Sequence, residues 1–284
     1  MVKIVTDSTS DLPKEFVQKH NIAVVPLTAI FGSKSYRDGV DLSPKQFYDM
    51  LPTAQDHPTT SQPTPSDFAA VYRPLVEAGH EIVSLHLSSK LSGTYASAIA
   101  AKNELETQLK KSVPITVIDT TWISMALGML VITAAQAAEA GKSRDEIVAM
   151  INAIIPKMNL IFVLDTLEYL KRGGRIGGAR AMLGTVLNVK PMLEVVNGVI
   201  EPLEQPRSRA KALRRLMEIF DKRADAQKPL HAGVLHAVSA EDAAALEKQI
   251  KSRPQCKEFY LTEIGAVIGV HVGPNALGLA FYSE

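Results

Sequence analysis

The sequence has little cysteine and no excess charge of either sign. It contains one cysteine, Cys256, in 284 residues, which excludes an intrachain disulfide framework and a zinc site built on several cysteines. Lysine and arginine number 31 against 30 aspartates and glutamates, for a net charge of +1, so the overall charge does not favour binding to nucleic acid or to an anionic membrane. Any site for an anion must therefore be local.

Uninterrupted hydrophobic runs are also scarce. The stretch between Asp119 and Glu139 carries no charge and is long enough for a transmembrane helix, but threonine, serine and glutamine residues interrupt it and alanine dominates its second half. We therefore expect a buried helix there and no stable membrane insertion. The N-terminus passes from residues 1–4 directly into the polar run 6–11, which is unlike a secretory signal. These features and the single cysteine predict a cytoplasmic protein.

Short β-branched runs alternate with helical patterns in the first half of the chain. Strands are expected at residues 3–6, 23–27, 81–85 and 115–118. Helix N-caps are expected at Ser43, which precedes a proline, at Ser66, and at Ser143, which has a glutamate three residues later. Strands and helices in alternation predict a parallel sheet with helices on its faces.

Three of these strands end at loops rich in aspartate, serine or threonine. The loops begin at Asp7, Ser88 and Asp119. Ligands of parallel α/β sheets bind beyond the carboxyl ends of the strands. We therefore expect these loops to open on a common edge, which is the first place to look for a site.

The pattern changes near Pro156. A strand is expected at 159–164, and Asn197-Gly198 between two apolar runs is a strong signal for a β-hairpin. Further on we expect an amphipathic helix at 208–225, a strand at 231–235, a helix at 241–251 and final strands ending with 277–282. Hairpins mixed with helices indicate an α+β domain. The predicted fold class is α/β, with an N-terminal parallel-sheet domain at 1–156 packed on a C-terminal α+β domain at 157–284.

Hydroxyl side chains gather in two loops of the first half. Thr60 and Ser61 lie in a proline-rich irregular stretch, where turn formation alone can explain them. Ser92 and Gly93 lie in the loop 88–94, which follows a strand and opens a helix, and a simple N-cap role for Ser92 is the alternative. The same hydroxyls can donate hydrogen bonds to a carboxylate, helped by backbone N–H groups at the helix start. The residues alone leave both interpretations open.

The histidines and aspartates indicate no metal site. His231 and His236 are an odd number of residues apart on an expected strand, so they face opposite sides. Asp38 and Asp41 have too few neighbouring ligands for calcium. His271 differs, because it ends an apolar run at the edge of a loop. It can donate to an anion, act as a base or only pack.

Two arginines have distinctive surroundings. Arg175 sits between glycine pairs, and Arg207 begins a local basic run that extends to Arg215. A solvated surface is the simpler explanation for both. Residues 173–178 match neither the dinucleotide-binding fingerprint nor the P-loop, so no nucleotide is assigned.

A serine hydrolase is the main alternative that the residues offer. Ser92, His271 and either Asp7 or Asp119 supply the residue types of a catalytic triad. The nucleophile-elbow pattern Gly-x-Ser-x-Gly is missing from the sequence, which argues against this alternative. A hydrolase would turn over an ester by itself and form a covalent adduct on Ser92 with an acylating reagent.

Six ordered motifs together resemble the DegV family of bacterial fatty-acid-binding proteins, whose better-known members are the acyl-carrier subunits of fatty acid kinase. The motifs lie at residues 5–13, 36–41, 60–63, 88–94, 167–176 and 271–274. Each is weak alone, but the ordered set is specific and spans nearly the whole chain. Two positions depart from the family pattern, since Asn275 stands where glycine is frequent and Ser208 where threonine is expected.

The resemblance implies a lipid-binding carrier with no catalytic residues of its own. One long-chain fatty acid such as palmitate, stearate or oleate would lie in a buried tunnel, with no further cofactor and no metal. The carboxylate would be bound by Thr60, Ser61, Ser92 and Gly93, with His271 beside it. The cations facing the partner or a phosphate would be Arg175 and Arg207.

The implied partner is a dihydroxyacetone-kinase-like subunit of fatty acid kinase. It would use ATP to phosphorylate the bound acid to an acyl phosphate that feeds phospholipid synthesis. A third possibility is a protein-interaction module in which lipid is only structural. Salt-sensitive binding to a macromolecule that is lost on neutralising the basic run 207–215, whatever the lipid content, would indicate such a module.

Overall fold

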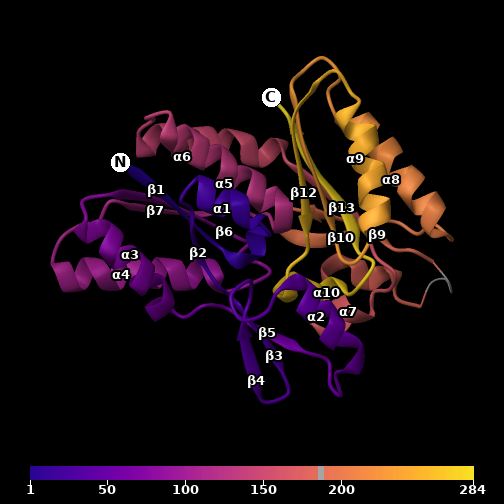
Figure 1. Cartoon of the computed structure of the whole chain (residues 1–284), viewed down its shortest axis with the longest axis horizontal. Helices are drawn as coiled ribbons and strands as arrows, with labels where there is room; N and C mark the ends of the chain where they lie inside the picture. The colour runs from indigo at the N-terminus through magenta and orange to yellow at the C-terminus, as the bar shows by residue number, and fades with distance from the viewer. Residues whose placement is uncertain (185–188) are drawn as a thin grey trace.

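Three β-sheets organise the chain (Figure 1). The structure, a computed structural model, describes residues 1–184 and 189–284. Its strands form a four-stranded sheet of order β2-β1-β6-β7, a six-stranded sheet of order β10-β9-β8-β13-β11-β12 and a three-stranded sheet of order β4-β3-β5. The fold is α/β, as the sequence predicts.

The four-stranded sheet is built from the four runs that the sequence identifies as strands. Its members are β1 (Val2–Asp7), β2 (Ala23–Val25), β6 (Glu81–His86) and β7 (Ile115–Asp119). All neighbouring pairs run parallel, which confirms the prediction. Alternate residues face opposite sides, so that Ile4 and Val83 join one core cluster while Val5 and Ile82 join another.

Helices cover both faces of this sheet (Figure 1). On one face lie α3 (Pro65–Glu77) and α4 (Thr94–Leu109), and on the other lie α5 (Ser124–Glu139) and α6 (Arg144–Ile154). Because both faces are covered, the strands are apolar on both sides, as parallel sheets require.

Capping boxes start three of the described helices. Ser43 and Ser143 form capping boxes, as predicted, for α2 (Pro44–Met50) and for α6. The prediction of Ser66 as an N-cap is wrong. Thr64 caps α3 instead, because Pro65 occupies the first turn and Asp67 completes a capping box with Thr64.

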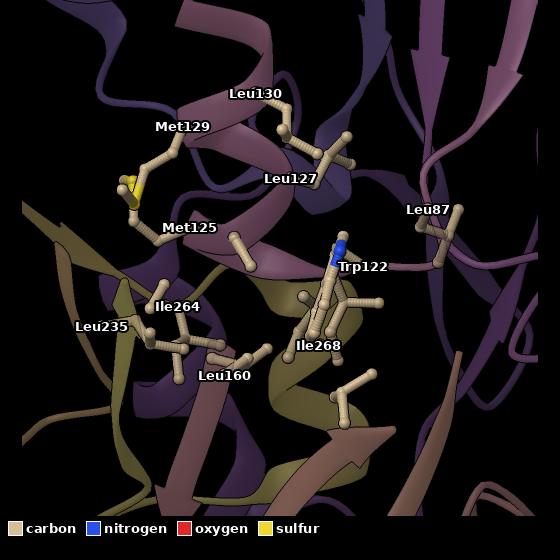
Figure 2. Close-up of a cluster of buried hydrophobic side chains, with 14 of the residues drawn as sticks. Leu87, Trp122, Met125, Leu127, Met129, Leu130, Leu160, Leu235, Ile264 and Ile268 are labelled. Carbon is tan, nitrogen blue, oxygen red and sulfur yellow. The ribbon is translucent and has the colours of Figure 1, made fainter. Parts of the chain in front are cut away.

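The charge-free stretch forms α5, which is buried along most of its length. This helix contacts β1 and β6 of one sheet and β11 and β13 of another, so it lies between two sheets and is apolar all round. The approach is close, since a Cβ on Gly233 of β11 would lie 2.5 Å from Cγ of Met125. Figure 2 shows Met125, Met129 and Leu130 of this helix within the core. In the described part of the chain, no helix is long and apolar enough to cross a bilayer.

The six-stranded sheet contains the strands of the second half. They are β8 (Asn159–Val163), β9 (Met192–Val196), β10 (Val199–Glu204), β11 (Leu230–His236), β12 (Cys256–Glu263) and β13 (Leu277–Ser283). β11 and β12 run parallel and the other pairs antiparallel. The predicted hairpin is confirmed, with Asn197 (φ 49°) and Gly198 (φ 82°) at its turn.

Two amphipathic helices pack on the outer face of this sheet (Figure 1). They are α8 (Arg209–Arg223) and α9 (Ala240–Lys251). Their apolar sides meet the sheet in a core cluster separate from the one that contains α5. All six strands follow residue 158, and the division into domains at 1–156 and 157–284 stays a prediction.

The three-stranded sheet was not predicted. It consists of β3 (Thr28–Phe31), β4 (Lys34–Arg37) and β5 (Thr59–Ser61), all antiparallel. The expectation of an irregular loop around Thr60 is therefore wrong, because Thr60 pairs with Ala29. A three-residue strand between prolines has no pattern of its own, and only pairing with β3 makes it a strand.

Three short helices complete the described chain. They are α1 (Lys14–Lys19), α7 (Glu168–Arg172) and α10 (Ala266–Val272). His271 lies in the last turn of α10, so its expected position at a loop edge is corrected to a helix end. In Figure 1, α7 and α10 lie near the base of the six-stranded sheet, close to the three-stranded sheet.

Candidate functional site

A cavity of about 290 Å³ lies where the loops of the four-stranded sheet meet β5, α7 and α10. We call it the hydroxyl-lined cavity. Its polar lining consists of Thr9, Thr60, Ser61, Gln62, Ser92, Arg175 and His271. Its apolar lining consists of Leu27, Leu87, Leu91, Ile123, Leu170, Ile200, Val267, Ile268 and Val272. A few polar groups on an apolar wall suit a ligand with a long apolar part and a small polar end.

Thr60 and His271 meet at this cavity. Oγ1 of Thr60 lies 3.0 Å from Nε2 of His271. Burial lowers the pKa of His271 to about 4, with smaller contributions from the charges of Arg175 and His57, so the imidazole is neutral near pH 7. Its other nitrogen, Nδ1, is buried and has no hydrogen-bond partner among the described residues.

Ser92 and Gly93 lie on the loop between β6 and α4. Oγ of Ser92 lies 2.9 Å from Oγ1 of Thr94 and accepts a hydrogen bond from the Thr94 backbone N–H at 3.3 Å. Gly93 occupies the N-cap position of α4, so the predicted N-cap role of Ser92 is displaced by one residue. The backbone N–H groups at the start of α4 therefore lie next to Ser92 in sequence, and Ser92 lines the cavity.

Gln62 is a lining residue that the sequence analysis did not single out. Its Nε2 donates to Oγ of Ser97 at 3.1 Å, and its side chain crosses the backbone of Gly93. A Cβ on Gly93 would lie 2.2 Å from Oε1 of Gln62. In the sequence, Gln62 directly follows Thr60 and Ser61, and this position could have marked it as a lining residue.

Arg175 reaches the cavity from the glycine-rich segment. Its Nε donates to the Leu91 carbonyl at 3.2 Å and its Nη1 to the Gly173 carbonyl at 2.8 Å. Both acceptors are uncharged, so these bonds leave the positive charge of the guanidinium unneutralised. The side chain is exposed at the edge of the lining.

Arg207 lies elsewhere. It is exposed before α8 and is outside the described lining of the hydroxyl-lined cavity. The next arginine, Arg209, pairs with Asp242 at 2.6 Å and lies 3.7 Å from Asp165. The structure thus brings Thr60, Ser61, Ser92, Arg175 and His271 to one cavity, with Gly93 beside it, and Arg207 is not among the lining residues.

The proposed triad of a serine hydrolase is not assembled. The hydrogen bonds that the described residues make join Ser92 to Thr94 and His271 to Thr60. The Asp119 carboxylate accepts from the backbone N–H groups of Ser89 at 3.2 Å and Thr121 at 2.9 Å. The Asp7 carboxylate contacts His86.

Asp7 belongs to a fully buried relay. Its Oδ2 lies 2.9 Å from Nδ1 of His86, and Nε2 of His86 lies 2.7 Å from Oγ of Ser84. The hydroxyl of Tyr72 donates to Ser84 at 2.7 Å. This Ser-His-Asp alignment has no exposed member and Ser84 does not line a described cavity, so it is structural.

A small apolar cavity adjoins the hydroxyl-lined cavity. This end cavity measures about 20 Å³. Four residues line both spaces, namely Ile123, Ile200, Ile268 and Val272. Figure 2 shows Leu160, Leu235, Ile264 and Ile268, which line the end cavity, gathered at the base of the core.

A further cavity of about 480 Å³ lies on the other side of the start of α10. Asp11 and Asp38 line it, and their Oδ1 atoms accept from the backbone N–H groups of Gly265 at 2.9 Å and Ala266 at 3.0 Å. Burial raises the pKa of Asp11 to about 8 and that of Asp38 to about 6. Among the described residues, no cluster of three or more metal-ligating side chains is present.

Comparisons with known proteins agree over the whole length. The family model described as "Uncharacterised protein, DegV family" matches residues 1–284. The DegV domain-containing protein SCO2569 of Streptomyces coelicolor is 42% identical over 285 residues, with 100% of this chain and 99% of that protein covered.

Two solved structures are similar throughout. A DegV family protein from Thermus thermophilus, described as binding fatty acid, has a TM-score of 0.92 at 36% identity, covering 100% of this chain and 99% of that one. A stearic-acid-binding protein from Eubacterium ventriosum has a TM-score of 0.92 at 30% identity, covering 100% and 98%.

Proposed function

The chain belongs to the DegV family, and we propose that it binds one long-chain fatty acid in the hydroxyl-lined cavity and presents the carboxylate to a partner kinase. The observation that carries this proposal is the convergence of Thr60, Ser61 and Ser92 at one end of an apolar space. The similarity to the fatty-acid-binding protein of Thermus thermophilus supports it.

The apolar walls account for affinity. Burying each methylene of an acyl chain is worth about 0.8 kcal/mol, so about fourteen methylenes give on the order of 11 kcal/mol before costs. Ordering the flexible chain and losing its translational freedom offset a substantial part of this gain. The tail therefore supplies most of the binding free energy, and the head-group contacts supply orientation.

Neutral donors bind the head group in this proposal. The hydroxyls of Thr60, Ser61 and Ser92 and the N–H of Gly93 donate to the carboxylate. A buried arginine pair would hold the carboxylate more tightly and reduce its nucleophilicity toward a phosphoryl group. Hydroxyl donors orient the carboxylate and keep it reactive.

His271 acts through Thr60. The imidazole is neutral, so one of its nitrogens carries the proton. With the proton on Nε2, His271 donates to Oγ1 of Thr60 across 3.0 Å and leaves the Thr60 hydroxyl proton free for the carboxylate. With the proton on Nδ1, Thr60 would donate to His271 instead. We propose the Nε2–H tautomer for the loaded carrier.

The partner in this proposal is a dihydroxyacetone-kinase-like subunit that works with ATP in the cytoplasm. It phosphorylates the exposed carboxylate to an acyl phosphate for phospholipid synthesis. Arg175 faces the incoming phosphate, since its charge is unneutralised at the edge of the cavity, and Arg207 faces the partner's surface. Catalysis belongs to the partner, and this chain is the carrier.

Mass analysis of the purified protein under native and denaturing conditions tests the first half of the proposal. We expect one fatty acid per chain, released intact on denaturation. A protein that binds no fatty acid, even when incubated with palmitate, stearate and oleate, would refute the proposal.

Acyl phosphate formation with the kinase subunit and ATP tests the second half. Replacing both Thr60 with Val and Ser92 with Ala should leave lipid bound and slow phosphorylation. Ser89→Ala is the matched control, because Ser89 is an exposed serine of the same loop outside the lining. Unchanged turnover in the double variant would contradict the assigned roles.

A further inference from the structure

A cross-strand pair of the six-stranded sheet belongs to the lining of the end cavity. Phe162 of β8 lies directly opposite Gly278 of β13 in the antiparallel register. Both residues line the end cavity together with Leu235. Phe162 is 5% exposed, so its ring is packed within the core.

Gly278 lines the end cavity at a point where the surrounding atoms leave little room for a side chain. A Cβ on Gly278 would lie 3.0 Å from Cβ of Phe162, 3.1 Å from the Ile161 carbonyl oxygen and 3.3 Å from Cγ of Leu235. The backbone of Gly278 lies outside the left-handed region, so alanine is conformationally allowed there. A methyl group at this position would press on these neighbours and narrow the lining between β8 and β13.

This end cavity adjoins the hydroxyl-lined cavity. Ile123, Ile200, Ile268 and Val272 line both. An acyl chain with its carboxylate at Thr60 and Ser92 would pass these four side chains if it extended toward β8 and β13. At about 20 Å³, the end cavity has room for little more than one terminal carbon group.

We propose that Phe162 and Gly278 form the wall that stops the acyl chain and sets the longest fatty acid that this carrier accepts. The proposal rests on the fatty-acid binding proposed above and adds the residues that select chain length. A larger side chain at position 278 leaves no room for the last carbons of the longest fatty acid. A smaller side chain at position 162 makes room for a longer one.

A pair of opposite substitutions tests this wall. The protein is loaded from an equimolar mixture of saturated straight-chain acids of graded length, and the bound acids are measured by mass spectrometry. Gly278→Ala should shift the bound profile toward shorter acids, and Phe162→Leu should shift it toward longer ones. The ratio of neighbouring lengths should change by about fourfold for each methylene that gains or loses its place, which corresponds to about 0.8 kcal/mol.

Phe281→Leu is the matched control. Phe281 lies three residues along β13, is fully buried and belongs to the core cluster on the other face of the same sheet. It should lower stability and leave the profile unchanged. If Gly278→Ala does not fold, Phe162→Leu decides the question alone.

The outcomes separate this proposal from the one on which it rests. A wild-type protein that binds no fatty acid refutes the proposed function. A protein that binds fatty acid with the same length profile in wild type and in Phe162→Leu and Gly278→Ala overturns the end wall only. A shift that Phe281→Leu reproduces overturns it as well, because the effect would then follow from loosened packing.

Discussion

Oγ1 of Thr60 lies 3.0 Å from Nε2 of His271, although 211 positions separate the two residues in the chain. The contact joins β5 of the small antiparallel sheet to the last turn of α10. It fixes a hydroxyl beside a neutral imidazole at the polar end of an otherwise apolar cavity. The first two predictions concern this pair.

Thr60→Val should weaken head-group positioning without unfolding the protein. Valine keeps the shape of threonine and removes the hydroxyl, so the expected loss is about 0.5–1.5 kcal/mol for one neutral hydrogen bond. Fatty-acid affinity measured by titration checks the size of the loss. Thr59→Val is the control and should bind normally, because Thr59 is exposed and does not line the cavity. Equal fatty-acid affinities of Thr60→Val and Thr59→Val would show that the Thr60 hydroxyl does not bind the head group.

His271→Gln should make stability less sensitive to acid. The folded-state pKa of His271 is about 4, below its ordinary value of 6.5, because the site is buried. The unfolded chain therefore binds a proton that the folded protein does not, and stability falls as the pH drops from 6.5 toward 4. The effect is on the order of 3 kcal/mol at its limit.

Urea denaturation at a series of pH values measures this effect. The unfolding free energy of the wild type should fall faster than that of His271→Gln in this range. Glutamine retains an N–H donor for Thr60, so His271→Gln should also bind fatty acid more tightly than His271→Leu. Parallel pH profiles for wild type and His271→Gln would show that the imidazole does not titrate in this way.

Asp11→Asn should stabilise the protein at alkaline pH relative to the wild type. Burial raises the folded-state pKa of Asp11 to about 8 from 3.8, so the folded protein holds the proton more tightly than the unfolded chain. The contribution of Asp11 is complete below about pH 4 and is lost as the pH rises through 8. Asparagine stays neutral at every pH and can still accept from the Gly265 N–H.

The difference in unfolding free energy between Asp11→Asn and wild type should therefore grow in favour of the variant from pH 4 to pH 8. Asp41→Asn is the control, because the pKa of Asp41 is lowered whereas that of Asp11 is raised. Asp41 is paired with Arg37, which lowers its pKa to about 2, so this variant should gain nothing at alkaline pH. A constant difference between Asp11→Asn and wild type would contradict the raised pKa.

Gly198→Ala should cost more stability than Gly141→Ala. Both glycines have positive φ, 82° and 81°, so alanine at either position costs about 1–2 kcal/mol in backbone conformation. A Cβ on Gly198 would also lie 2.5 Å from Oγ of Ser88, whereas Gly141 has open space. Ser88 donates to the Gly198 carbonyl at 2.7 Å, and this contact docks the hairpin turn on the loop after β6.

Chemical denaturation of the two variants isolates the docking contact, because the conformational cost is common to both. The excess loss in Gly198→Ala measures the contact between the hairpin and the loop after β6. Equal losses of stability in Gly198→Ala and Gly141→Ala would show that the hairpin turn accommodates the added methyl group without strain.

Regular elements with strong local patterns were predictable. The four strands of the parallel sheet, the capping boxes at Ser43 and Ser143 and the Asn197-Gly198 hairpin are each specified by a few neighbouring residues. Residues within one strand, turn or helix start interact directly, so their identities predict them.

The site was only partly predictable. The motifs indicated Thr60, Ser61, Ser92, Arg175 and His271, and these residues do line one cavity. No local pattern indicated that Thr60 is on a strand or that the Gln62 side chain lies against Gly93. Arg207 was grouped with Arg175 but does not line the cavity, because a basic residue has no local signal for where its side chain goes.

The class of fold, the burial of α5 and the residue types available to bind an anion follow from the amino-acid sequence. The pairing of β5 with β3, the contact of His271 with Thr60 and the placement of Gly278 opposite Phe162 arise only when the chain is folded. Local elements follow from short-range periodicity and capping. A cavity is the volume that side chains from distant segments leave unfilled, and no single segment encodes that volume.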